Sequence, residues 1–242
     1  MRRRIRIAGF AMVWTGVLTL GIVAYQLVVT DILNDRVQDE ARTGLATEFE
    51  ERRTTLESPV TVTVTVPEST TDATTPTTAV VETIDFHPEE AVDEGDALGV
   101  IRIPSIDLDW VLFGGVTPAT LNQGPGHMPW TPLPGQPGNA VVSGHRTTYG
   151  APFYDLDQLD PGDVIEVETA IGVHEYTVRD TIIVTANDVW VTDPKPGAWL
   201  TLTTCHPKFS AAQRLVVQAE LTAGPNLDYA EFLFDAEFSD VS

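Results

Sequence analysis

The chain has little positive charge and only one cysteine. Of its 242 residues, 14 are Lys or Arg and 35 are Asp or Glu, so the formal net charge is −21. A chain that binds nucleic acid neutralises phosphates with a basic patch, and this composition excludes that class of partner. The single cysteine, Cys205, excludes an intrachain disulfide. No acidic cluster has the spacing of a calcium site, so we expect neither a metal nor another cofactor.

The few basic residues gather at the N-terminus. Four arginines within the first six residues precede an uncharged stretch, Ile7–Thr30. About 20 apolar residues cross a bilayer as a helix, and the positive-inside rule places such an N-terminus in the cytoplasm. We predict that residues 1–30 are a cytoplasmic Arg cluster and a transmembrane helix, and that the rest of the chain lies outside the cell membrane. A cleaved signal peptide is the alternative, but it has a shorter apolar core and a small-residue cleavage site.

Three stretches outside the main domain differ in composition. Residues 31–53 carry an apolar residue at every fourth position and predict a juxtamembrane helix. Residues 54–96 are mostly Thr, Pro, Val and acidic, which predicts a disordered spacer. Within them Val60–Val66 alternates at the strand period and has the alternative of pairing with an exposed sheet edge. Residues 223–242 are an acidic tail with several aromatics, which either docks on the domain or hangs free.

Residues 97–222 contain short β-rich runs separated by turn residues. The runs are Leu98–Ile103, Ile106–Phe113, Asn139–Ser143, Val164–Thr169, Val173–Val184, Val189–Thr192, Trp199–Thr204 and Arg214–Leu221. A hairpin turn is predicted at Ala170–Gly172, and Thr117 before Pro118 is typical of a helix N-cap. The fold class predicted is mainly β, a closed eight-stranded barrel with short helices.

Cys205 is the first candidate for chemistry. It ends a strand-like run and is followed by His206 and Pro207. Proline cannot extend a strand ladder, so the thiol is expected at the rim of the sheet, where a substrate can reach it. In an exported protein an unpaired thiol is an oxidation liability. We therefore interpret Cys205 as a nucleophile rather than a packing residue.

A thiol nucleophile needs a proton acceptor, usually a histidine. His145 ends the apolar run that starts at Ala140, so it also lies at a strand end and is the best candidate. Its neighbour Arg146 is expected to point away from it. His127, in a Gly-Pro-Gly loop, is a competitor, whereas His174 lies among charged residues and is expected to be exposed.

Acyl transfer also needs a hydrogen-bond donor for the developing oxyanion. Arg214 opens the strand that follows the short connection after Cys205. A hairpin would place the two side by side, so Arg214 is the candidate donor.

These three sites lie in motifs that resemble those of the sortases. The Cys, His and Arg motifs of that family are similar to Thr201–Cys205, Gly144–Arg146 and Gln213–Val217. Class E sortases in particular are similar at Gly124–His127, Pro134–Asn139 and His145–Phe153. The resemblance covers Leu98–Thr222, about half of the chain.

The resemblance implies a membrane-anchored cysteine transpeptidase with an eight-stranded barrel. Such an enzyme cleaves a Leu-Ala-x-Thr-Gly sorting signal between Thr and Gly and passes the acyl group from a Cys205 thioester to an amine of the cell wall. The implied partners are surface proteins that bear the signal and a peptidoglycan or precursor amine. It also implies that Thr204 contacts the substrate or oxyanion and that Tyr149 shapes the groove. The alternative is an exported β-barrel that binds or scaffolds without catalysis.

Overall fold

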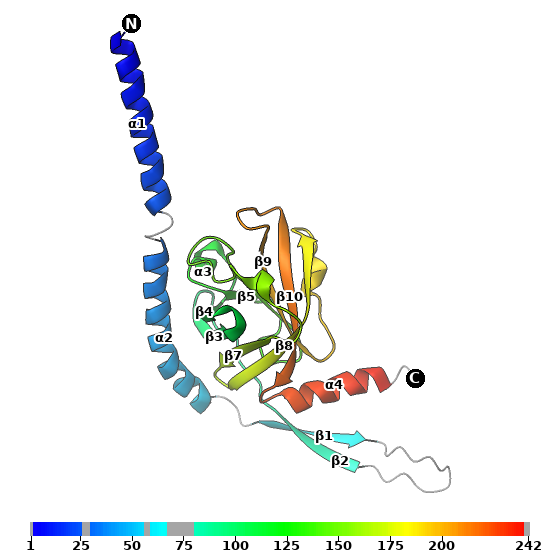
Figure 1. Ribbon diagram of the computed structural model, residues 1–242. Coiled ribbons are helices and arrows are strands. Elements are labelled where there is room, and N and C mark those ends of the chain that lie inside the picture. The colour runs from blue at the N-terminus through cyan, green and yellow to red at the C-terminus, as the bar shows by residue number, and fades with distance from the viewer. Residues whose placement is uncertain (1, 26–29, 56–58, 67–79, 240–242) are drawn as a thin grey trace.

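The computed structural model describes residues 2–25, 30–55, 59–66 and 80–239. Its main body is a closed barrel with the strand order β10-β8-β7-β3-β4-β5-β6-β9 (Figure 1). These strands are β3 (Ala97–Ile103), β4 (Leu108–Gly114), β5 (Gly126–His127), β6 (Gly138–Ser143), β7 (Val164–Thr169), β8 (Gly172–Thr185), β9 (Ala198–His206) and β10 (Gln213–Ala223). The prediction of a mainly β, closed eight-stranded barrel is confirmed.

Short helical segments join the strands. They are η2 (Pro104–Ile106), α3 (Pro118–Leu121), η3 (Leu156–Gln158) and η4 (Val189–Thr192). The predicted cap is present, because the Thr117 side chain accepts a hydrogen bond from the amide of Thr120 at the start of α3.

One predicted strand was wrong and one strand was missed. Val189–Thr192 is the helical turn η4, and two of its apolar side chains, Val189 and Trp190, are 71% and 52% exposed. The apolar residues Val189 and Trp190 therefore lie on the surface and do not indicate a buried strand. The missing strand is β5, whose two residues pair with β4 in parallel and with β6 in antiparallel fashion. Two residues are too few to show any strand periodicity.

The barrel core consists of alternate residues along each strand. Leu200 and Leu202 of β9 and Leu215 and Val217 of β10 are all at most 3% exposed and belong to one hydrophobic cluster. Because successive side chains of a strand point to opposite faces, the residues between these four point outward. This alternation decides which face of the sheet carries the candidate site.

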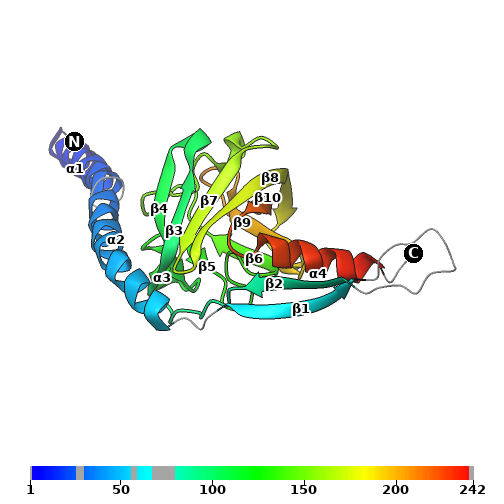
Figure 2. The ribbon, with the colours of Figure 1, turned by 90° about the horizontal axis from the view of Figure 1, so that it is seen from below.

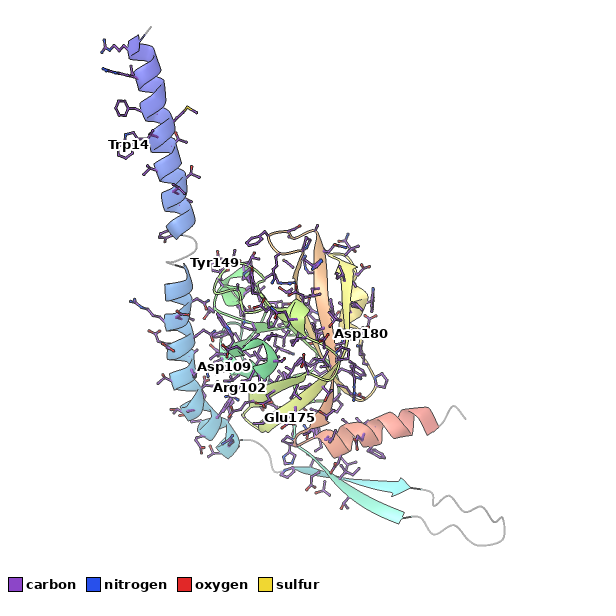
Figure 3. All side chains as sticks on the ribbon, in the orientation of Figure 1. Trp14, Arg102, Asp109, Tyr149, Glu175 and Asp180 are labelled. Atoms are coloured by element: carbon purple, nitrogen blue, oxygen red, sulfur yellow. The ribbon has the colours of Figure 1, made fainter. Side chains whose placement is uncertain are left out.

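The predicted helix at residues 31–53 is present as α2 (Thr30–Thr55), which lies along the side of the barrel (Figures 1 and 2). Gln38 donates to the carbonyl of Gln123 at 2.8 Å and accepts from the amide of Val111 at 2.7 Å. Farther along, Arg42 forms an ion pair with Asp109 at 2.9 Å. Figure 3 shows Asp109 on the face of the barrel turned toward α2. The helix is therefore docked on the barrel by specific polar contacts.

Part of the predicted disordered spacer is a β-hairpin, so that prediction was wrong there. β1 (Val60–Val66) pairs in antiparallel register with β2 (Val80–Phe86), from Val60 opposite Phe86 to Val66 opposite Val80. The alternating pattern of β1 did indicate a strand, but its partner is this second segment and not an edge of the barrel. Residues 67–79 of the spacer lie outside the described residues.

The acidic tail docks rather than hangs free. Residues Leu227–Ser239 form the helix α4, which lies beside the β1–β2 hairpin (Figure 2). The rings of Tyr229 and Phe86 approach to 4.6 Å between centroids. This aromatic contact therefore joins the tail to the spacer.

At the N-terminus, α1 covers Arg2–Ala24. Among the residues described, no helix combines the length and the apolar character that a membrane crossing requires. The predicted span, Ile7–Thr30, includes residues 26–29, which lie outside that description.

Two titratable groups near the β7–β8 turn have pKa values shifted by removal from water. His174 is 0% exposed, and burial lowers its pKa from 6.5 to about 4. Glu89 accepts a hydrogen bond from the amide of Ala170, and burial raises its pKa from 4.5 to about 7. The expectation that His174 is exposed was wrong. Its charged neighbours in sequence sit on the other face of the strand.

These two groups predict opposing pH dependences. Between pH 4.5 and 6.5 the unfolded chain protonates His174 while the folded chain does not, so His174 makes stability rise with pH. Glu89 holds its proton only in the folded chain, so it makes stability fall with pH. We expect His174→Gln and Glu89→Gln to change the pH slope in opposite directions, each by about 2–3 kcal/mol over this window. Urea unfolding at both pH values measures this, and slopes parallel to that of the unsubstituted protein would contradict it.

Candidate active site

Cys205 and Arg214 lie on neighbouring strands, directly opposite one another. The antiparallel register of β9 and β10 pairs Arg214 with Cys205 and Leu215 with Thr204. Leu215 is in the core, so the Arg214–Cys205 pair points to the outer face. Directly opposed side chains start from Cβ atoms about 5 Å apart. The guanidinium and the thiol therefore share one rim of the barrel, as the hairpin argument predicted.

His145 reaches the same rim from the other side of β9. Strand β6 runs parallel to β9, with Ser143 beside Thr203, and the amide of Gly144 donates to the Thr203 carbonyl at 3.1 Å. His145 and Cys205 each lie two residues beyond these paired positions. The pairing ends at Ser143, and His145 follows on the segment beside the end of β9, so a position of the imidazole beside the thiol stays a prediction. The sequence places these residues 60 apart, and the β6–β9 pairing joins them.

Burial sets the protonation of His145. Its Nε2 atom is buried and has no hydrogen-bond partner among the described residues. Removal from water disfavours the imidazolium, so burial lowers the pKa of His145 from its ordinary value of 6.5. At neutral pH the free site therefore favours the imidazole, which can accept a proton. Cys205 is a free thiol, neither fully buried nor fully exposed.

The side chain of Arg214 is partly fixed at the rim. Its Nη1 donates to the carbonyls of Ala211 and Gln213, at 3.1 and 2.9 Å. Both carbonyls belong to the β9–β10 connection and its end, so they hold the guanidinium near the strand ends. Arginine carries five N–H donors in a planar fork, so donors beyond Nη1 exist for a developing oxyanion.

The predicted groove residue Tyr149 packs on His145. The two ring centroids are 5.0 Å apart and the planes are inclined by 31°. Tyr149, Gly150 and Ala151 all have left-handed backbone conformations, with φ of 53°, 72° and 49°. A Cβ at Gly150 would collide with the indole of Trp110. Strained backbone of this kind persists only where its surroundings hold it, as it does in this loop. Figure 3 shows Tyr149 at the end of the barrel away from Glu175.

Thr204 has a partner within the protein. Its side chain is 3% exposed, and its hydroxyl donates to the carbonyl of Gly144 at 2.8 Å. This bond ties the strand of Cys205 to the segment that carries His145. A contact between Thr204 and substrate stays a prediction.

His127, the competing candidate for the base, forms hydrogen bonds within its own loop. His127 is 4% exposed, and its Nε2 lies 2.8 Å from the carbonyl of Pro132 and 3.2 Å from the hydroxyl of Thr131. Burial lowers its pKa from the ordinary value. Because its ring nitrogen is bonded within its own loop, His127 is a structural residue, and His145 remains the candidate base.

Arg146 is a residue whose importance sequence reasoning missed. It is 2% exposed, and its guanidinium contacts the carbonyl of Cys205 and the carboxylate of Asp157. A charged residue after a strand end normally indicates a position on the surface, so no local signal in the sequence predicted the burial of Arg146.

Within the described residues no group of three or more His, Cys, Asp or Glu side chains is arranged to hold a metal ion.

Comparison with known proteins places this geometry in a family. The sortase domain family matches residues 101–222. The chain is 32% identical over 145 residues to sortase SrtE1 of Streptomyces coelicolor, covering 53% of this chain and 41% of that protein. It is 32% identical over 123 residues to sortase D of Bacillus subtilis, covering 50% and 59%. The chain thus spans less than two thirds of the length of these curated relatives.

A solved structure has the same fold. The X-ray structure of Clostridium perfringens sortase C with the C-terminal cell wall sorting motif aligns with a TM-score of 0.51 at 30% identity. The alignment covers 55% of this chain and 74% of that one.

Proposed function

Because this chain belongs to the sortase family, we propose that it is a class E cysteine transpeptidase that acts on a Leu-Ala-x-Thr-Gly sorting signal. One observation carries the proposal: Arg214 opposes Cys205 across an antiparallel pair, while the parallel pairing of β6 with β9 ends two residues before both His145 and Cys205. This arrangement supports a site in which thiol, imidazole and guanidinium act on the same substrate carbonyl. A binding barrel without catalysis has no use for this convergence.

Cys205, His145 and Arg214 have different roles in the proposed reaction. The Cys205 sulfur attacks the carbonyl carbon of the Thr–Gly bond, and His145 takes the thiol proton. Arg214 donates hydrogen bonds to the resulting oxyanion. Collapse of the intermediate breaks the C–N bond, the glycine amine leaves with the proton from His145, and a thioester remains on Cys205.

The second half of the reaction returns the enzyme to its starting state. An amine of peptidoglycan or its precursor attacks the thioester carbonyl, and His145 takes the proton of that amine. The C–S bond then breaks, and the sulfur of Cys205 recovers the proton. The product is a new amide that joins the surface protein to the cell wall.

Class E and its signal are supported by the three motifs at Gly124–His127, Pro134–Asn139 and His145–Phe153, and by similarity to SrtE1. We expect the full chain to cleave a Leu-Ala-x-Thr-Gly peptide with a kcat/KM roughly tenfold or more above that for Leu-Pro-x-Thr-Gly. Mass spectrometry of the released glycine fragment and of the acylated protein measures both. Equal rates would exclude the class E preference, and two intact peptides would favour the binding barrel.

We also propose that the chain is anchored in the cell membrane with its barrel outside. The support is the Arg cluster before the uncharged stretch Ile7–Thr30. A membrane-impermeant maleimide should then label Cys205 in cells stripped of their wall. Labelling only after lysis would overturn this topology.

A further inference from the structure

The guanidinium of Arg146 is buried between the two segments that carry the proposed catalytic pair. Nε donates to the carbonyl of Tyr154 at 2.8 Å, Nη1 donates to the carbonyl of Cys205 at 3.4 Å, and Nη2 pairs with Asp157 at 2.8 Å. Two nitrogens therefore donate hydrogen bonds and the third lies in an ion pair, with partners on two stretches of chain, residues 154–157 and the end of β9. The fork geometry of arginine suits such a three-way contact.

This arrangement has a cost that a packing role does not require. Moving a charged group out of water is unfavourable even when it is paired, and an apolar side chain of similar size often serves stability equally well. The Arg146 side chain is 1% exposed, whereas its partner Asp157 is 41% exposed. The burial therefore falls almost wholly on the cation. A role beyond stability accounts for keeping a cation at this position.

The connectivity indicates what that role is. Arg146 is covalently next to His145, and its head contacts the main chain of Cys205. Asp157 also lies 3.7 Å from Lys208, in the connection that follows Cys205. The Arg146–Asp157 pair thus joins the histidine segment to the cysteine strand and to the connection beyond it. The Thr204–Gly144 bond joins the same segments on the other face.

We propose that Arg146 is a positioning residue that holds the imidazole of His145 against the sulfur of Cys205. The inference rests on the proposed function for its meaning, since it concerns the same catalytic pair. Without Arg146, the loop after β6 keeps the bonds of Gly144 to Thr203 and Thr204 but loses its contact with the carbonyl of Cys205. His145 would then sample positions out of reach of the thiol.

The test combines Arg146→Gln with His145→Ala in the full chain. The rate of Cys205 alkylation by iodoacetamide is followed against pH, so no peptide substrate is needed. We expect Arg146→Gln to move the pH profile toward that of His145→Ala, and to cause no further change when added to His145→Ala. In the transfer assay kcat should fall roughly 10- to 100-fold with little change in KM. Arg146→Lys, which keeps the charge but not the fork, should recover part of the loss.

Arg179→Gln is the matched control. It removes an ion pair of the same length, 2.8 Å to Glu220, on the exposed side of β8 and β10. Its alkylation profile and kcat should stay at the values of the unsubstituted protein. If Arg146→Gln does not fold, Asp157→Asn gives the same test, with a smaller shift expected in the same direction.

Two results would overturn the inference. One is a lowered melting temperature with an unchanged alkylation profile and unchanged kcat, which would make Arg146 purely structural. The other is an Arg146→Gln effect that persists without His145, which would mean that the cation acts on the thiol directly. Failure of the unsubstituted protein to process peptide would count against the proposed function alone, because the alkylation experiment stands without it.

Discussion

Cys205→Ala is expected to stop both peptide cleavage and acyl transfer. Cys205 is the only thiol in the chain, so no other side chain can form the thioester. The loss should be at least about 10⁴-fold, down to the uncatalysed background, as for removal of other covalent nucleophiles. Intact-mass measurement after incubation with a Leu-Ala-x-Thr-Gly peptide should show the acyl adduct only in the unsubstituted protein.

The fold of this variant should be intact. Cys205 is only partly buried and faces outward from β9, so alanine leaves no large cavity. The melting temperature therefore serves as the control for folding. Turnover above background in a folded Cys205→Ala variant would remove Cys205 from the mechanism.

Arg214→Ala is expected to lower kcat roughly 10²–10³-fold, the range found for loss of one oxyanion donor. The reason is the cross-strand register, which pairs Arg214 with Cys205, the residue whose sulfur is proposed to attack the substrate carbonyl. KM should change much less, because the interaction strengthens only as charge develops on the oxygen. Steady-state kinetics with separate determination of kcat and KM measures this.

Two further variants sharpen the Arg214 result. Arg214→Lys should lie between the unsubstituted protein and Arg214→Ala, because an ammonium restores charge but not the planar fork. Arg179→Ala, on the neighbouring strand β8, removes a cation that pairs with Glu220 and should leave kcat unchanged. An Arg214→Ala variant that raises KM with kcat intact would assign Arg214 to substrate binding instead.

Local patterns predicted most of the barrel. Runs such as Val164–Thr169 are strands because their alternation matches the burial of one face, and Thr117 before Pro118 marked a real helix start. Sequence periodicity did not predict the secondary structure of segments whose conformation depends on the neighbouring strands or on their exposure. Val189–Thr192 is a helical turn in which Val189 and Trp190 are exposed, and Gly126–His127 is a strand only because β4 and β6 lie on either side of it.

The candidate site was predictable where it depends on residues close in sequence and not where it depends on distant ones. Cys205 and Arg214 are close in sequence, so a hairpin argument places them together. His145 needed the non-local pairing of β6 with β9, which chain order alone does not reveal, and the strand-end position was its only signal. Arg146 was missed because burial of a cation depends on Asp157 and on a carbonyl 59 residues away.

Because α2 is docked on the barrel, the spacer that follows it does not determine how far the barrel lies from the start of α2. Arg53, at the end of α2, donates to the carbonyl of Ala170 at 2.9 Å, and Glu89 accepts from the amide of that same residue at 3.1 Å. Arg53 and Glu89, at the two ends of the intervening segment, therefore contact the same residue of the barrel. The segment between Arg53 and Glu89 therefore does not set the distance between α2 and the barrel. Inserting residues into it would leave the distance from Thr30 to the catalytic rim unchanged. Doubling its length would add only about 0.6 kcal/mol of closure entropy.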